Sequence, residues 1–128
     1  MSDDIMPLTA AGSVAVWCGD EVTAGDGASD TAHRYSTLAS GALGLEERNQ
    51  AKSGVGWMVD GNTLTGQLDA AASGSAGVTV GYVFLMAGLL DSFANVAGMQ
   101  QAVADTIAHA AELFPGARIV VGCGPGCI

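Results

Sequence analysis

A short apolar run that ends in a Gly-Asp turn constrains this chain more than any other stretch. Residues 13–18 read Ser-Val-Ala-Val-Trp-Cys, and Gly19 and Asp20 follow directly. A continuous apolar run of this length is typical of a strand that is buried on both faces of a sheet. In an α/β sheet, ligands bind where such strands end. The sequence therefore predicts that residues 19–25 lie beside a functional site.

The rest of the chain alternates between predicted helices and predicted strands. We expect helices at 32–43, 63–72 and 96–114, and further strands at 46–51, 80–87 and 117–121. Asn95 can cap the last helix, and Tyr35, Leu38, Ala39, Ala42 and Leu43 fall on one side of the first. This alternation indicates parallel βαβ units with right-handed crossovers. We predict one α/β domain over residues 12–128, after an N-terminal tail at 1–11.

The charge of the chain limits its partners. Thirteen acidic and four basic residues give a net charge of −9, so few cations exist to neutralise the phosphates of a nucleic acid or an anionic membrane surface. The first residues, Met-Ser-Asp-Asp, are acidic where a secretory leader is basic. The apolar run at 82–90 is shorter than the roughly 20 residues that span a bilayer. We expect no signal peptide, a cytoplasmic or virion location, and no nucleic acid or membrane partner.

The cysteines and the loop acids are the candidate metal ligands. Cys18 lies on the first strand and is expected to be a small core residue. Cys123 and Cys127 can form a disulfide, bind a metal with outside help, or stay reduced; two sulfurs fall short of the four ligands of a structural zinc site. Asp20, Glu21, Asp26, Asp30 and Asp91 could offer oxygen ligands to Ca²⁺, although loop acids are usually solvated. We expect no metal and no cofactor.

Four short motifs follow one another along the chain. They are residues 19–25 (Gly-Asp-Glu-Val-Thr-Ala-Gly), 49–54 (Asn-Gln-Ala-Lys-Ser-Gly), 88–91 (Gly-Leu-Leu-Asp) and 114–121 (Phe-Pro-Gly-Ala-Arg-Ile-Val-Val). Their order resembles that of the SGNH hydrolase (GDSL esterase/lipase) family over roughly residues 12–122. The resemblance implies a truncated flavodoxin-like α/β sandwich with about four parallel strands in the order 2-1-3-4.

The departures from that family fall on its catalytic positions. Glu21 stands where the family has its nucleophilic serine, and Leu90 stands where it has an oxyanion asparagine. The chain ends before the family's late Asp-x-x-His, and neither His33 nor His109 is placed to substitute. Acyl transfer needs an activated nucleophile and oxyanion donors together. The resemblance therefore implies no catalytic residue and leaves vestigial positions at Glu21, Gly54, Leu90 and Asp91.

The same strand ends hold the candidate binding residues, which are Asp20, Glu21, Gly54, Trp57 and Asp91. Two interpretations of Glu21 stay open. Its side chain points to water, or its carboxylate accepts hydrogen bonds from backbone N–H groups of the vestigial oxyanion hole and locks the loop.

The last predicted strand carries the candidate interface. In the family's strand order it is an edge, and an exposed apolar edge strand invites pairing with another chain. The candidate interface residues are Ile119, Val120, Val121, Cys123 and Cys127. We expect this edge to be covered by a second copy, by another protein or by the chain's own tail.

The preferred function is a non-catalytic structural or interaction module within a larger assembly. SGNH-like modules of phage capsid and tail accessory proteins supply the analogy for a virion component. Two alternatives stay open. One is an SGNH-type esterase or acylhydrolase, acting on ester or carbohydrate-ester substrates, whose missing half comes from a separate chain. The other is a carbohydrate-binding module that does not hydrolyse its ligand.

Overall fold

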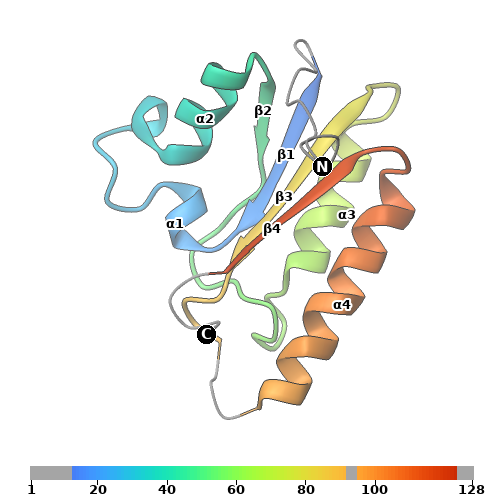
Figure 1. The fold of residues 1–128 in the computed structure, drawn as a ribbon. Helices are drawn as coiled ribbons and strands as arrows, with labels where there is room; N and C mark the ends of the chain where they lie inside the picture. The colour runs from blue at the N-terminus through green and yellow to red at the C-terminus, as the bar shows by residue number, and fades with distance from the viewer. Residues whose placement is uncertain (1–12, 92–94, 124–128) are drawn as a thin grey trace, which may run out of the picture.

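The computed structural model describes residues 13–91 and 95–123. These residues form one parallel sheet with helices packed against it (Figure 1). The strands are β1 (Val14–Gly19), β2 (Glu46–Asn49), β3 (Val80–Ala87) and β4 (Arg118–Cys123). They lie in the order β2-β1-β3-β4, and every neighbouring pair is parallel. The predicted α/β flavodoxin-like fold class is therefore confirmed. The predicted tail at 1–11 and Cys127 lie outside the described residues.

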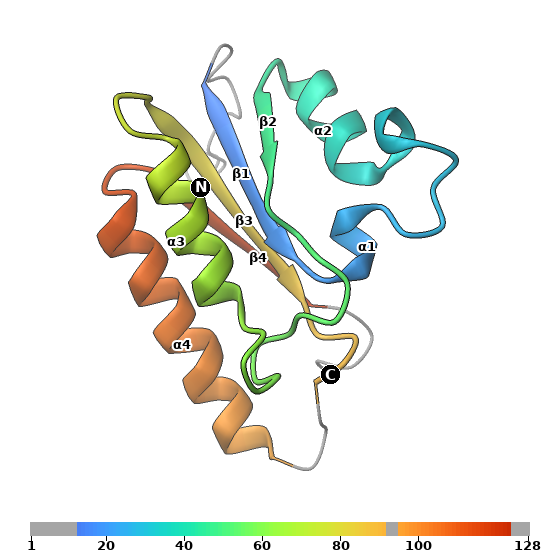
Figure 2. The same cartoon turned by 180° about the vertical axis from the view of Figure 1, so that it is seen from behind.

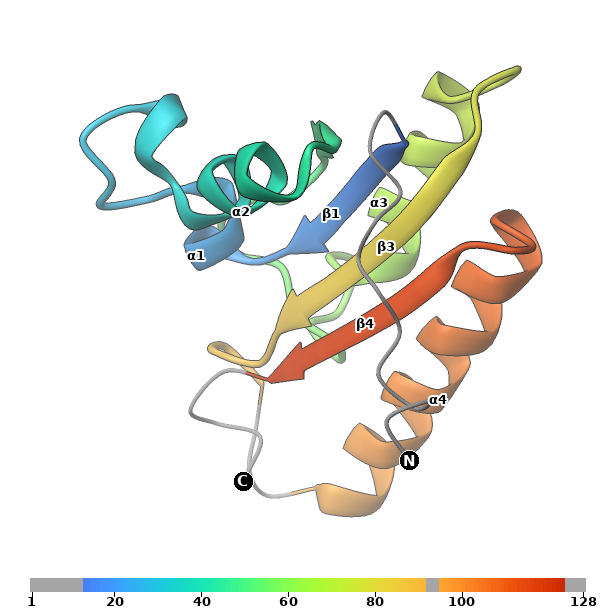
Figure 3. The same ribbon diagram turned by 45° about the horizontal axis from the view of Figure 1, so that its top comes forward.

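Helices cover both faces of this sheet (Figure 2). The helices α3 (Leu64–Gly74) and α4 (Val96–Leu113) pack side by side on one face. On the other face α2 (Tyr35–Leu43) lies beside β1 and β2 (Figure 3). A one-turn helix, α1 (Glu21–Ala24), follows β1 directly, and the 3₁₀ turn η2 (Thr31–His33) precedes α2. No helix in the described part of the chain is both long enough and apolar enough to cross a membrane.

Most element boundaries agree with the predicted ones, and one predicted helix is divided. Asn95 caps α4 as expected, because its side chain accepts a hydrogen bond from the Gly98 N–H at 2.9 Å. The helix expected at 32–43 is broken at Arg34, whose φ of −71° and ψ of 151° are extended. Asp30 caps the short first part by accepting from the His33 N–H at 3.1 Å. A local side-chain cap therefore starts a separate turn ahead of α2.

The larger core lies between the sheet and the helices α3 and α4. Val16, Leu64, Leu68 and Leu85 are fully buried there. Cys18 belongs to the same cluster, and burial raises the pKa of its thiol to about 12. A thiol with that pKa stays neutral, so the prediction of Cys18 as a small core residue is confirmed.

On the opposite face, α2 buries hydroxyl groups rather than the predicted apolar stripe. Leu38 is 55 % exposed and Tyr35 is 37 % exposed, whereas Ser36 and Ser40 are buried. The indole N–H of Trp17 donates to Ser40 Oγ at 2.9 Å. The apolar side of this helix therefore does not coincide with its buried side, where Ser40 supplies a hydrogen-bond acceptor for the buried indole of Trp17.

An aromatic stack fills the space under α2. The rings of Trp17 and Phe84 lie 3.9 Å apart between centroids, with an interplanar angle of 9°. Tyr82 continues the stack, with its ring centroid 6.1 Å from that of Phe84. Ala39 and Leu43 pack against this cluster, and the ring of Tyr35 meets that of Trp17 edge-on, with 5.5 Å between centroids.

Candidate functional site

A buried carboxylate connects the first motif to the third at the carboxyl ends of β1 and β3. Asp20 is 3 % exposed and caps α1, accepting from the Val22 N–H at 3.1 Å. Its second oxygen accepts from the Leu89 N–H at 3.3 Å, in the loop that follows β3. Both oxygens are thus engaged by backbone groups, so Asp20 holds two loops together.

A second buried carboxylate connects the third motif to the loop after β2. Asp91 is 4 % exposed and accepts from the Trp57 N–H at 3.0 Å and from the Met58 N–H at 2.8 Å. Gly56 allows this approach, because a Cβ there would lie 2.9 Å from both carboxylate oxygens. Asp91, predicted as a binding residue, therefore has a structural role in this loop.

The buried side chain of Gln67 holds the end of β1 from the α3 side. Its Oε1 accepts from the Gly19 N–H at 2.7 Å, and its Nε2 donates to the Gly19 carbonyl at 2.9 Å. Both backbone groups of Gly19 are satisfied in this way. Gln67 is not among the site residues predicted from the sequence. One sequence feature could have indicated it, because Gln67 is a polar residue next to Leu68 on the inward side of a predicted helix.

Glu21, which the sequence resemblance would align with a nucleophilic serine, is partly buried at the start of α1. Its Oε2 accepts from the Ser53 hydroxyl at 3.3 Å, which links α1 to the loop after β2. Its Oε1 is buried and has no hydrogen-bond partner. Within the described residues the side chain thus neither points freely to water nor accepts the predicted backbone hydrogen bonds.

The other predicted residues, Gly54, Trp57 and Leu90, differ in how far they are buried. Gly54 occupies a turn with φ of +85°, a conformation that glycine adopts without strain, and open space surrounds it. Trp57 is 2 % exposed and belongs to the larger core, and its indole N–H has no hydrogen-bond partner in the described part of the chain. Leu90, which the sequence resemblance would align with an oxyanion asparagine, is 48 % exposed. The apolar side chains of Leu89 and Val22 are exposed to a similar degree.

Neither histidine lies at these strand ends. His33 pairs with Asp30. His109 Nε2 lies 2.7 Å from Asp69 Oδ1, an exposed contact that connects α4 to α3. Among the described side chains of residues 13–91 and 95–122, no three His, Cys, Asp or Glu residues gather as metal ligands. The loop acids proposed for Ca²⁺ do not converge.

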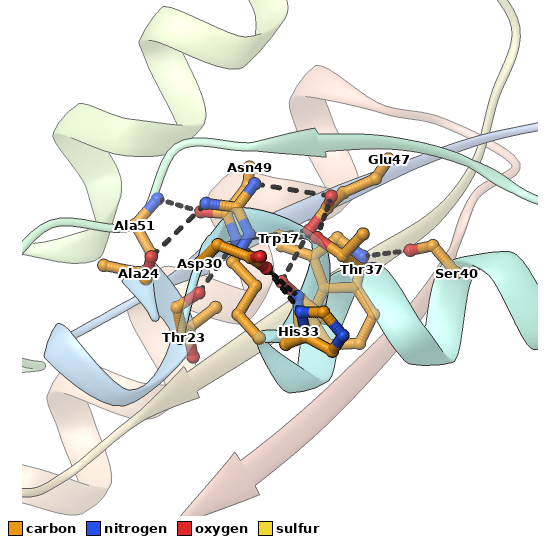
Figure 4. Close-up of polar contacts among 12 residues, drawn as sticks. Trp17, Thr23, Ala24, Asp30, His33, Thr37, Ser40, Glu47, Asn49 and Ala51 are labelled. Carbon is orange, nitrogen blue, oxygen red and sulfur yellow. Dashed lines mark hydrogen bonds and ion pairs between the residues drawn. The ribbon is translucent and has the colours of Figure 1, made fainter. Parts of the chain in front are cut away.

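A polar network lies between α2 and β2 (Figure 4). No motif in the sequence predicts it. Glu47 accepts from the hydroxyls of Ser36 at 2.5 Å and Thr37 at 2.6 Å, and lies 3.3 Å from Arg34 Nη2. Burial by itself raises the pKa of the Glu47 carboxyl. The hydrogen bonds from Ser36, Thr37 and Arg34, with the positive charge of Arg34, outweigh burial and lower the pKa overall.

The network continues from β2 to α1 through Asn49. Its Nδ2 donates to Ser36 Oγ and to the Thr23 carbonyl, each at 2.9 Å, and its Oδ1 accepts from the Ala51 N–H at 2.8 Å. The Thr23 hydroxyl meets the Tyr35 hydroxyl at 2.6 Å. Burial raises the pKa of the Tyr35 hydroxyl. The hydrogen bond with Thr23 lowers this pKa, the negative charge of Asp20 raises it, and the pKa is raised overall.

The Glu47→Gln variant tests this network through pH. A carboxyl with a lowered pKa in the folded state stabilises the fold above its unfolded pKa, and this contribution is lost as the pH falls through the folded value. We expect the variant to lose about 2 kcal/mol of unfolding free energy at pH 7. The difference from wild type should shrink below about pH 4.3, the usual Glu pKa. Urea unfolding of both proteins, from pH 7 to below about pH 4.3, measures this difference in unfolding free energy. A difference that stays constant with pH would contradict a lowered pKa for Glu47.

Three of the four sequence motifs meet at one end of the sheet, through the contacts of Asp20 with Leu89 and of Glu21 with Ser53. Convergence of loops at the carboxyl ends of the strands is general for doubly wound sheets, so it does not identify a family. The relationship to SGNH hydrolases therefore stays a prediction. Comparison with models of protein families and with curated protein sequences finds no match for this chain.

Proposed function

We propose that this chain is a non-catalytic interaction module that joins a larger assembly through the outer edge of β4. The observation that carries this proposal is the position of β4 at the end of the strand order, where its described pairing is with β3. Val121 is 39 % exposed, and Ile119 and Val120 are half-buried beside it. An apolar edge strand is a template for a strand from another chain. Self-association or a protein partner, as in a virion accessory protein, fits this surface.

The strand ends support a role without turnover. Hydrolysis requires a nucleophile, a base and donors for the oxyanion in one place. In the described part of the chain, Asp20 and Asp91 accept hydrogen bonds from backbone groups, and Glu21 accepts from Ser53. Both histidines are paired elsewhere. No base therefore accompanies Glu21 among these residues.

Light scattering on wild type and Val121→Lys tests the interface. We expect the wild type to have at least twice the monomer mass, and the variant to run as a monomer with an unchanged circular dichroism spectrum, because an edge lysine opposes strand pairing. Leu38→Lys is the matched control, since Leu38 is an exposed apolar residue on α2, and this variant should keep the wild-type mass. A wild-type monomer would contradict self-association through this edge, and a Val121→Lys variant of unchanged mass would contradict the assignment of the interface to β4.

The same preparations test the absence of turnover. We expect wild-type protein and Glu21→Ala to hydrolyse a short-chain aryl ester no faster than buffer. Turnover by the wild type that disappears in Glu21→Ala would overturn the non-catalytic role.

A further inference from the structure

A small cleft is lined by residues of the loop that follows β2 and of the first turns of α3. Figure 2 shows this loop and α3 on the side of the molecule away from the outer edge of β4. Its volume is about 240 Å³. The residues that line it are Gln50, Lys52, Val55, Gly61, Asn62, Thr63, Gly66, Gln67 and Ala70. Ligand pockets for drug-sized molecules have roughly 300–1,000 Å³, so this cleft suits a smaller molecule.

The charge of the cleft is opposite to that of the protein. The chain has a net charge of −9, yet none of the lining residues is acidic and Lys52 contributes a positive charge. Arg34 and Arg48 pair with Glu47 and Glu46. No such partner is recorded for the Lys52 ammonium among the described residues. The charge of Lys52 is therefore available to an anion from solution.

Two residues with side-chain amides, Gln50 and Asn62, line the same cleft as Lys52. Their amides make no hydrogen bond with the described residues, and each amide can both donate and accept. The Thr63 hydroxyl is already bonded to that of Thr65 at 2.7 Å. Val55 and Ala70 complete the wall with apolar groups. The cleft thus combines one cation, two uncommitted amides and a short apolar surface.

We propose that this cleft binds a small monocarboxylate that also carries a hydroxyl group. Lys52 pairs with the carboxylate, which gains a charge-assisted hydrogen bond. The amides of Gln50 and Asn62 bond to the ligand's hydroxyl, and its carbon atoms contact Val55. One ammonium balances one negative charge, so a phosphate dianion is a poorer match. This site does not depend on the proposed role of β4.

Gln67 connects the cleft to the end of β1. It lines the cleft, is 6 % exposed, and holds both backbone groups of Gly19. A molecule that contacts Gln67 changes the surroundings of the Gly19 amide as well. The Gly19 signal is therefore an independent readout of occupancy.

Titration of the folded chain with sodium lactate, followed by ¹H–¹⁵N NMR, tests the site. We expect lactate to shift the side-chain amide signals of Gln50 and Asn62 and the backbone signal of Gly19 with one saturable constant. Lactamide, the neutral analogue, should bind about tenfold more weakly, because it lacks the charge-assisted bond to Lys52. Inorganic phosphate should bind more weakly than lactate.

Variants of the single cation complete the test. Lys52→Gln should weaken lactate binding about tenfold, so that lactate and lactamide bind with similar affinity. Lys52→Arg keeps the positive charge and should still bind lactate more tightly than lactamide. Arg48→Gln, which changes a basic residue outside the cleft, should bind lactate like the wild type. The proposal is overturned if lactate leaves the amide signals unshifted, if lactamide or phosphate binds as tightly as lactate, or if Lys52→Gln and Arg48→Gln behave alike.

Discussion

Replacing Gly19 by alanine is expected to lower the unfolding free energy by about 3 kcal/mol, because the site has no room for a methyl group. A Cβ at this position would lie 2.2 Å from the Met86 carbonyl oxygen and 2.6 Å from Thr23 Oγ1. The nearest obstacle is backbone, which cannot rotate away. The ends of β1 and β3 would have to separate, and the two hydrogen bonds between Gly19 and Gln67 would stretch. Urea unfolding measures the loss.

Gly41→Ala is the matched control for this substitution. Gly41 lies within α2, and nothing is within 4 Å of the position that its Cβ would take. Alanine favours a helix over glycine, so this variant should gain up to about 1 kcal/mol. Equal effects of the two substitutions would show that the close approach of β1 to β3 at Gly19 is not a constraint on stability.

Replacing Asp91 by alanine is expected to cost about 3 kcal/mol, because it leaves two backbone donors without an acceptor. The donors are the N–H groups of Trp57 and Met58. Asp91→Asn keeps one acceptor oxygen and should lose less. Besides the unfolding free energy, hydrogen exchange at Trp57 and Met58 reports the effect, and both amides should exchange faster in the variants.

Asp105→Ala is the control for loss of a carboxylate. Asp105 lies on the exposed side of α4 and accepts from the Gln101 side chain at 2.8 Å. Its removal should change stability by no more than about 0.5 kcal/mol. If Asp91→Ala were equally mild and left exchange at Trp57 and Met58 unchanged, Asp91 would not organise the loop after β2, and its place as a binding residue would have to be reconsidered.

The parallel fold was predictable from patterns that are local in the chain. The continuous apolar residues of β3 predict its range of 80–87, because a strand buried on both faces needs apolar groups at every position. The apolar spacing of α4 and its Asn95 cap also depend on residues within a few positions of one another. Alternation of such elements was enough to predict the parallel sheet.

The partners of the polar groups were decided by the tertiary structure alone. Trp17 and Ser40 are separated by 23 residues, and Trp57 and Asp91 by 34. No periodicity in the sequence reports such pairs. Ser36 and Ser40 face the core because Trp17 and Glu47 require hydrogen-bond partners there. A buried polar group must find a partner wherever the fold supplies one, so its role depends on which loops and helices the sheet brings together.

The dependence of buried polar groups on partners supplied by the fold also explains the roles of Asp20 and Asp91 at the strand ends. Sequence motifs correctly marked the loops that meet there, since parallel strands end on one side of a sheet. They marked Asp20 and Asp91 as binding residues, yet their carboxylates are engaged by backbone N–H groups of neighbouring loops. The sequence by itself determined where charged side chains gather. Only the tertiary structure decided that these two stabilise the loops, because their acceptor capacity is used within the protein.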